Sequence, residues 1–139
     1  MILLDTNVLS EFMIHAPDVC VVNWLNSQPR SSVWTTSINV YEIRSGLLAM
    51  PGGRRQAALS SVFERLLNMT IEGRIAVFDT VAAERAAELE AAGLKSGRPR
   101  DPRDTMIAGI VLASHATLAT RNTKHFEDIA KSVVNPWGG

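Results

Sequence analysis

The chain has only one cysteine, Cys20, and no excess of charge of either sign among its 139 residues. A single cysteine excludes an internal disulfide framework and any zinc site built from several cysteines. The 14 basic residues balance the 14 acidic ones, so the basic surplus that often marks a nucleic-acid-binding protein is missing. Any contact with nucleic acid would therefore depend on local groups of cations, or on metal ions that offset acidic residues.

Long apolar segments are also absent. The longest apolar run, residues 107–113, is far too short to cross a bilayer, so we expect no membrane-spanning segment. Asp5 interrupts the apolar start of the chain and no basic residue precedes it, which argues against a signal peptide. The composition is 46% hydrophobic and 20% charged, as in ordinary globular proteins. We therefore expect a cytoplasmic protein with one domain over residues 1–139.

Strand and helix patterns alternate along the chain, which predicts a parallel β-sheet covered by helices. The expected strands are residues 1–4, 32–37, 75–78, 116–120 and 132–134, the last at an edge. The expected helices are residues 8–13, 18–29, 38–50, 54–70, 81–92 and 102–115, with a short helix within 121–128. Asp18 and Asp101 are the expected N-caps of two of these helices, and Gly93 is the expected C′ residue after a third.

Three acidic residues occupy distinctive places in this pattern. Asp5 follows the first strand, Glu42 lies in the first turns of the helix after the second strand, and Asp104 lies in the first turn after Asp101. Strand carboxyl ends and helix amino ends share one edge of a parallel sheet, so these acids can meet there. Gathered carboxylates repel one another unless a cation or proton is present. Oxygen ligands suit Mg²⁺ or Mn²⁺, so the pattern predicts a metal site that faces a phosphate or phosphodiester.

Each acid also has a purely structural interpretation. Asp5 can be a turn residue, and Asp104 can interact favourably with the dipole of its helix. Glu42 comes three residues after Asn39 and can close a turn that resembles a capping box. The metal-site interpretation is favoured because the structural one needs three independent coincidences at one edge of the sheet.

Four segments carry a resemblance to a known family. Residues 1–11, 37–46, 104–108 and 118–126 resemble, in order, the four signature blocks of PIN-domain proteins. More narrowly, they resemble the VapC-type and FitB-like toxins of bacterial toxin–antitoxin systems, and residues 135–137 are similar to the FitB-like tail. The resemblance covers nearly the whole chain. It implies a three-layer α/β/α sandwich around a parallel sheet of four to five strands.

The resemblance also implies an activity and a set of site residues. The expected activity is metal-dependent cleavage of RNA, and Asp5, Glu42 and Asp104 match the three core acids of the family. The fourth family acid usually falls where this chain has Asn122, whose oxygen can still bind a metal-bound water. The loss of that charge makes a second metal less certain.

The same resemblance implies partners. They are an antitoxin of the VapB or FitA type, operator DNA reached only through that antitoxin, and a second copy of the chain. The helices between Ile38 and Thr70 are the expected surface for the homodimer.

These residues suggest a mechanism. Asp5 and Asp104 are expected to hold the principal Mg²⁺, with Mn²⁺ as an alternative, and Glu42 to act as a ligand or as the base for the attacking water. The ion would lower the pKa of that water and offset charge on phosphorus. Thr6 and Thr120 are candidates for hydroxyl groups that orient the carboxylates, although each can equally be only a turn or strand-end residue.

Basic residues flank the third and fourth blocks and are candidates for phosphate contacts. They are Arg98, Arg100, Arg103 and Arg121, with Lys95 and Lys124 near them. A charged loop is more often simply solvated, and we interpret Asp128 as a solvated surface acid. The three histidines, His15, His115 and His125, show no ligand spacing, so we expect no metal role for them.

Two other functions use the same features. A phospho-receiver domain is also a small parallel α/β protein, and Asp79 follows the third expected strand. Receivers, however, need an acidic pair after the first strand, and Asp5-Thr6 supplies one acid. A catalytically inactive binding module would use the acidic cleft only to dock a basic peptide. Incubation with RNA and with acetyl phosphate, with and without Mg²⁺, distinguishes the three functions.

Overall fold

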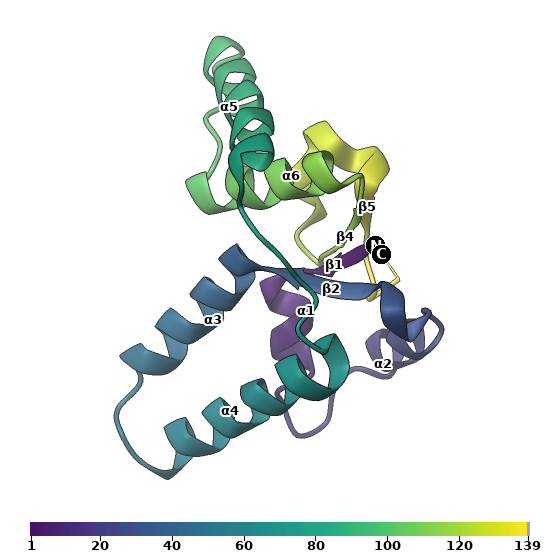
Figure 1. The fold of residues 1–139 in the computed structure, drawn as a ribbon, viewed down its shortest axis with the longest axis vertical. Coiled ribbons are helices and arrows are strands. Elements are labelled where there is room, and N and C mark those ends of the chain that lie inside the picture. The colour runs from purple at the N-terminus through teal and green to yellow at the C-terminus, as the bar shows by residue number, and fades with distance from the viewer. Residues whose placement is uncertain (139) are drawn as a thin grey trace.

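The computed structural model describes residues 1–138, and its centre is one parallel sheet with the strand order β3-β2-β1-β4-β5 (Figure 1). The strands are β1 (Ile2–Leu4), β2 (Val33–Thr36), β3 (Ile75–Ala76), β4 (Thr117–Ala119) and β5 (Val133–Val134). The parallel sheet and the edge position of β5 are confirmed. The prediction for the third strand, residues 75–78, was too long. Pairing stops at Thr36↔Ala76 because the chain of β2 turns into a helix at Ser37.

Helices connect the strands and cover the sheet. They are α1 (Thr6–Glu11), α2 (Val19–Asn26), α3 (Ser37–Ala49), α4 (Arg54–Arg65), α5 (Thr80–Lys95) and α6 (Pro102–Ser114), with the 3₁₀ segments η1 (Arg30–Ser32) and η3 (Thr123–Ser132). The predicted helix 54–70 changes at Leu66 into the π-helical segment η2 (Leu66–Ile71). Two expected N-caps are confirmed. Asp18 accepts from the Cys20 amide at 2.8 Å, and Asp101 accepts from the Arg103 amide at 2.9 Å.

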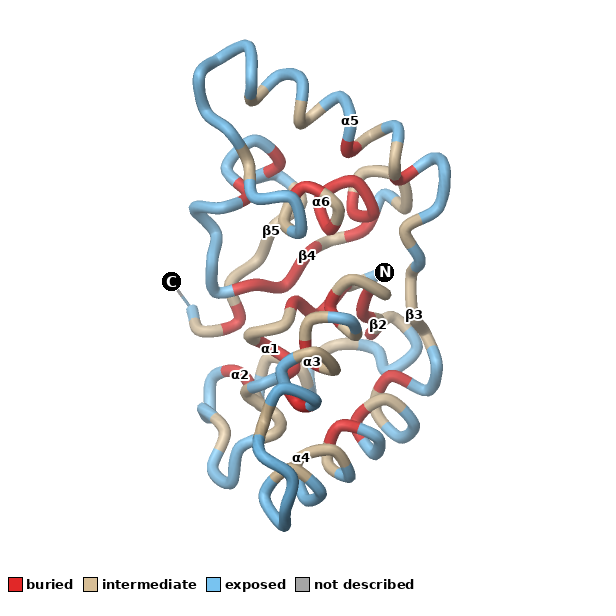
Figure 2. Tube along the Cα trace, turned by 90° about the vertical axis from the view of Figure 1, so that its left-hand side faces the viewer, coloured by how far each residue is buried: buried red, intermediate tan, exposed pale blue. Residues whose placement is uncertain are grey.

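The helices form separate layers on the two faces of the sheet. Helices α1 to α4 lie on one face, and α5 and α6 lie on the other (Figure 1). Because successive strand residues point to opposite faces, Leu3 packs with Ile107 in one apolar cluster and Leu4 packs with Phe63 in another. The buried residues lie along the central strands and the helix faces toward them, while the far end of α5 is exposed (Figure 2). This is the expected three-layer α/β/α sandwich.

Glycines allow two close approaches around α5. A Cβ on Gly109 in α6 would lie 2.5 Å from the Ala82 carbonyl oxygen, so α5 and α6 can touch only because Gly109 has no side chain. The expectation that Gly93 follows the end of α5 was wrong, because the helix continues to Lys95. The left-handed position after the helix is instead taken by Gly97, with φ of 72°. Gly93 remains inside the helix, where a Cβ would lie 2.7 Å from the Arg98 carbonyl oxygen, so the following loop can pack against it only because it has no side chain.

Within residues 1–138, none of the helices is both long enough and apolar enough to cross a membrane.

Candidate active site

The register of the central strands places Asp5 beside Thr120. Leu3 pairs with Leu118 and Leu4 with Ala119, so the next residues of β1 and β4, Asp5 and Thr120, lie together just beyond the sheet. The Asp5 amide continues the ladder by donating to the Ala119 carbonyl oxygen at 3.0 Å. The two strands thus end at the same level.

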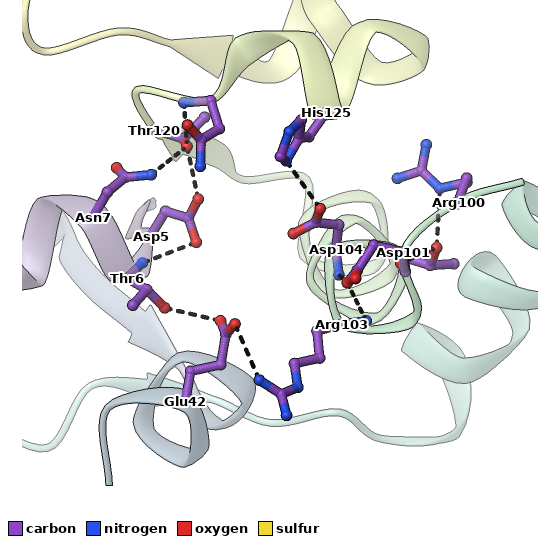
Figure 3. A network of polar contacts seen from close by, with 12 residues as sticks. Asp5, Thr6, Asn7, Glu42, Arg100, Asp101, Arg103, Asp104, Thr120 and His125 are labelled. Carbon is purple, nitrogen blue, oxygen red and sulfur yellow. Dashed lines mark hydrogen bonds and ion pairs between the residues drawn. The ribbon is translucent and has the colours of Figure 1, made fainter. Parts of the chain in front are cut away.

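The carboxylate of Asp5 is buried, with 5% of the residue exposed, and accepts hydrogen bonds from three donors. Figure 3 shows the contacts with Thr6 and Thr120. Its Oδ1 accepts from the Thr6 amide at 2.9 Å and from Asn39 Nδ2 at 2.8 Å. Its Oδ2 accepts from the Thr120 hydroxyl at 2.7 Å. Since a buried charge needs such partners, this environment accepts a carboxylate in one fixed orientation. The structural interpretation also applies, because Asp5 is the N-cap of α1.

Glu42 projects from α3 toward the same space (Figure 3). Its Oε1 accepts from the Thr6 hydroxyl at 2.8 Å, and its Oε2 lies 3.9 Å from Arg103 Nη1. The capping interpretation of Glu42 was wrong. Thr36 is the N-cap of α3, and its Oγ1 accepts from the Asn39 amide at 3.1 Å. Asn39 is therefore not the N-cap that a capping box with Glu42 would need, and the Glu42 side chain faces the site instead.

Asp104 enters from the first turn of α6, on the opposite side of the space from Glu42 (Figure 3). Its amide donates to Asp101 Oδ1 at 3.1 Å, so Asp101 rather than Asp104 caps the helix. The Asp104 carboxylate lies 3.2 Å from His125 Nδ1. No pattern in the sequence placed His125 at this site, because its proximity depends on how η3 packs against α6.

The three acids lie in one another's electric field. Burial is the main cause that raises the pKa of Glu42 above its ordinary value, and the charge of Asp5 raises it further. Burial is also the main cause that raises the pKa of Asp104, followed by the charge of Asp101, with a smaller contribution from Asp5. The Thr6 hydroxyl lowers the pKa of Glu42 and His125 lowers that of Asp104, but neither reverses the direction. A cation between the acids would relieve this repulsion.

The donor set fits a hard divalent cation in its chemistry and in its orientation. Three carboxylates from three separate elements face one space, and carboxylate oxygens are the ligands that Mg²⁺ and Mn²⁺ prefer. In the described part of the chain, no three acidic, histidine or cysteine side chains are already gathered closely enough to share one ion. Binding would therefore have to draw Glu42 and Asp104 inward, away from Arg103 and His125.

Two asparagines support the acids and were missed from the sequence. Asn39, fully buried, donates through Nδ2 to Asp5 and also to the Thr6 hydroxyl at 3.0 Å, so it connects Asp5 to the group that holds Glu42. Asn7 donates to the Thr120 hydroxyl at 3.2 Å. Asn39 lies in the second signature block and three residues before Glu42, and from that position it was interpreted only as part of a helix cap.

Asn122, the expected fourth position, contributes through its backbone. Its amide donates to the Thr120 hydroxyl at 3.1 Å, and Asn122 itself is exposed. Thr120 thus receives hydrogen bonds from Asn7 and Asn122 while it donates to Asp5. This network puts Thr120 and Thr6 in contact with the acids, in the arrangement expected of orienting hydroxyls.

The four candidate arginines have different surroundings. Arg98 is exposed, and Arg103 lies beside Glu42 with its guanidinium 5.0 Å from the ring centre of Tyr41. Arg121 stacks over Trp137 at 4.9 Å. Arg100 forms an ion pair with Asp128 and donates to Thr105, and only 9% of its side chain is exposed. Asp128 is therefore not simply a solvated acid, and Arg100 is committed to holding the protein together.

Known proteins resemble this chain over its full length. The PIN domain family matches residues 2–132. Plasmid stability protein StbB of Pseudomonas syringae pv. tomato is 38% identical over 137 residues, which are 99% of this chain and 99% of that protein. VapC ribonuclease Y4jK of Sinorhizobium fredii is 36% identical over 99% of this chain and 98% of its own.

A third relative has both a sequence and a structural match. Toxin FitB of Neisseria gonorrhoeae is 34% identical over 99% of both chains. A structure of FitAB bound to the IR36 DNA fragment superposes with a TM-score of 0.88 at 33% identity, over 100% of this chain and 97% of the other. Sequence and fold agree, and the chain belongs to the PIN-domain family, among relatives that include a VapC ribonuclease and toxin FitB.

Proposed function

We propose that this protein is the toxin of a toxin–antitoxin pair and acts as a metal-dependent endoribonuclease. The observation that carries the proposal is the convergence of Asp5, Glu42 and Asp104 on one space at the carboxyl edge of the sheet. Its relatives, VapC ribonuclease Y4jK and toxin FitB, support the assignment to RNA cleavage and to a toxin. The whole chain, residues 1–139, would act as one PIN domain.

In this proposal Asp5 and Asp104 hold Mg²⁺ or Mn²⁺, and Glu42 is either a third ligand or the base for the attacking water. When bound, the ion lowers the pKa of a water molecule and offsets negative charge that develops on phosphorus. Asp5 supplies the fixed reference point, because three hydrogen bonds set its orientation. The Thr6 hydroxyl, which donates to Glu42 Oε1 at 2.8 Å, orients Glu42 for either role. Arg103, which lies beside Glu42, would contact the scissile phosphate.

The partners of the relatives suggest partners for this chain. The FitAB structure with bound DNA supports an antitoxin of the FitA or VapB type, with operator DNA contacted through that antitoxin. A homodimer through the helices between residues 38 and 70 also remains a proposal. Leu48 on α3 and Met69 in η2 are strongly exposed apolar side chains in that region, at 78% and 64%, and burial in an interface would remove them from water.

Purified protein with a mixed RNA substrate tests this function. We expect cleavage with Mg²⁺ or Mn²⁺ and none with EDTA. Asp5→Asn and Asp104→Asn should each lose at least about 1,000-fold in rate while their circular dichroism stays that of the folded protein. Full activity of both variants would exclude the assigned site. A parallel incubation with acetyl phosphate tests the receiver alternative, in which Asp79, here the N-cap of α5, would become phosphorylated.

A further inference from the structure

A cavity of about 420 Å³ lies directly beside Asp104 and is not part of the acid cluster. It is open to solvent and lined by the end of α5, the loop of residues 96–101, the start of α6 and η3. Asp104 and His125 belong both to its lining and to the acid cluster, so the cavity and the proposed cleavage site are continuous. Small-molecule pockets in proteins typically measure about 300–1,000 Å³, so this volume suits one nucleoside.

The walls of this cavity are held in place without a ligand. The loop is tied to α5 by the hydrogen bond from the Arg98 amide to the Gly93 carbonyl oxygen, at 2.8 Å. Arg100, from the same loop, donates to Thr105 of α6 at 3.1 Å and pairs with Asp128 of η3. Because three elements fix the loop, the cavity is preformed, and a ligand would bind without ordering it first.

The chemistry of the lining selects the kind of ligand. Three Arg and Lys side chains, Arg98, Arg100 and Lys124, face four carboxylates, Asp101, Asp104, Glu127 and Asp128. A free phosphate or other small anion is therefore disfavoured. Apolar surface from Ala92 and Pro99 lies next to exposed donors and acceptors on Lys124 and Glu127. A nucleobase offers the matching combination of flat apolar faces and a polar edge that donates and accepts hydrogen bonds.

We propose that this cavity binds one nucleoside of the RNA substrate, adjacent to the phosphate that lies at the three acids, and so determines which sequence is cut. The proposal rests on the ribonuclease function proposed above. Lys124 donates to a carbonyl oxygen or ring nitrogen of the base, and Glu127 accepts from an exocyclic amine. Their substitution therefore changes the preference among bases rather than the chemical step.

The test is cleavage of a randomised RNA pool in Mg²⁺, followed by sequencing of the new 5′ ends. Glu127→Gln and Lys124→Gln exchange an acceptor or donor at nearly constant size, and Ala92→Trp fills the cavity. We expect each to shift the base preference at one position next to the cut by roughly tenfold. Ala92→Trp should raise KM more than it lowers kcat. Glu84→Gln and Lys131→Gln, on the exposed surface of α5 and η3, are matched controls that should leave the preference unchanged.

The results separate this inference from the proposed function. Active Glu127→Gln, Lys124→Gln and Ala92→Trp variants with the unaltered base preference would overturn the nucleoside site and leave the nuclease standing. A wild-type protein that cuts no RNA would overturn the nuclease itself. In that event the affinities of the Asp5→Asn protein and of the Asp5→Asn, Ala92→Trp double variant for short labelled RNAs of different sequence are compared. A sequence preference that Ala92→Trp removes would show that the cavity recognises bases. Equal binding of all sequences by both proteins would exclude it.

Discussion

Asp5 and Asp104 face the same space, but the protein holds them in opposite ways. Asp5 is 5% exposed, and its oxygens accept hydrogen bonds from α1, α3 and the end of β4. The side chain of Asp104 is 23% exposed, and its partner is His125, whose side chain is 58% exposed. Glu42 resembles Asp104, because its side chain is also 23% exposed and its charged neighbour, Arg103, is half in solvent.

This difference separates a fixed side of the site from an adjustable one. The donors to Asp5 are a backbone amide and two short, buried side chains, so the orientation of the Asp5 carboxylate is set when the protein folds. The Arg103 side chain is long and half exposed, and the His125 side chain is exposed, so both can move away from Glu42 and Asp104 when a metal cation binds. A site of this kind positions one ligand in advance and adjusts the other two on binding. Three groups of substitutions test the comparison, and their expected effects decrease in the order given below.

Thr120→Val should have the largest effect, because it attacks the fixed side directly. Valine has the same shape but removes the hydroxyl that donates to Asp5 Oδ2 and accepts from Asn7 and Asn122. Loss of such an orienting group typically lowers metal affinity or activity by about 10–100-fold. Calorimetric titration with Mn²⁺ measures the affinity without a turnover assay.

Two further variants check this result. Thr120→Ser restores the hydroxyl and should recover most of the affinity. Thr117→Val makes the same change at the other end of β4 and should leave the affinity unaltered. Wild-type Mn²⁺ affinity in Thr120→Val would show that Asp5 does not need its partner.

Asn39→Ala should follow, with an effect on stability as well as on binding. It removes the donor to Asp5 Oδ1 and to Thr6, and leaves a buried carboxylate with one partner fewer. A lost buried hydrogen bond of this kind costs about 1–3 kcal/mol in the free energy of unfolding. Urea denaturation measures it, and Asn23→Ala on the exposed surface of α2 is the control. A loss no greater than that of the control would mean that Asn39 is not needed to hold Asp5.

The sequence was sufficient for features that depend on local signals. We anticipated the N-caps at Asp18 and Asp101, the order of strands and helices, and the positions of the three acids next to strand ends and helix starts. Each of these features depends on a few neighbouring residues. The end of α5 was not anticipated, because either of two glycines, Gly93 and Gly97, could follow the helix. Packing against the loop selects Gly97 for the left-handed position.

The supporting residues of the site escaped prediction for a different reason. Asn39 contacts Asp5, which lies 34 positions away in the sequence, and Arg100 contacts Asp128, which lies 28 positions away. No short motif encodes these pairs, because they depend on how α3 packs on β1 and how η3 packs on α6. Sequence patterns can therefore locate the acids without showing how each one is held.

The smallest effect concerns stability and pH, and here the two sides of the site should differ in sign. Burial raises the pKa of Glu42 above 4.5 and that of Asp104 above 3.8 in the folded protein. Below these ordinary values both states are protonated and no penalty exists. As the pH rises above them, the unfolded chain releases its proton first, so stability falls until the folded pKa is passed. Without metal, Glu42→Gln and Asp104→Asn should therefore be more stable than wild type at about pH 7, and the gain should vanish near about pH 3.

Asp5→Asn should change stability in the opposite direction at neutral pH. An amide at this position must turn an NH₂ group toward the Thr120 hydroxyl or toward the donors Asn39 Nδ2 and the Thr6 amide. It therefore loses partners that the carboxylate satisfies. Thermal unfolding in EDTA at the two pH values measures the change in stability of each variant relative to wild type, with Glu84→Gln as the exposed control. If Glu42→Gln and Asp104→Asn lost stability as Asp5→Asn does, Glu42 and Asp104 would be structural anchors like Asp5, and the adjustable side of the site would not exist.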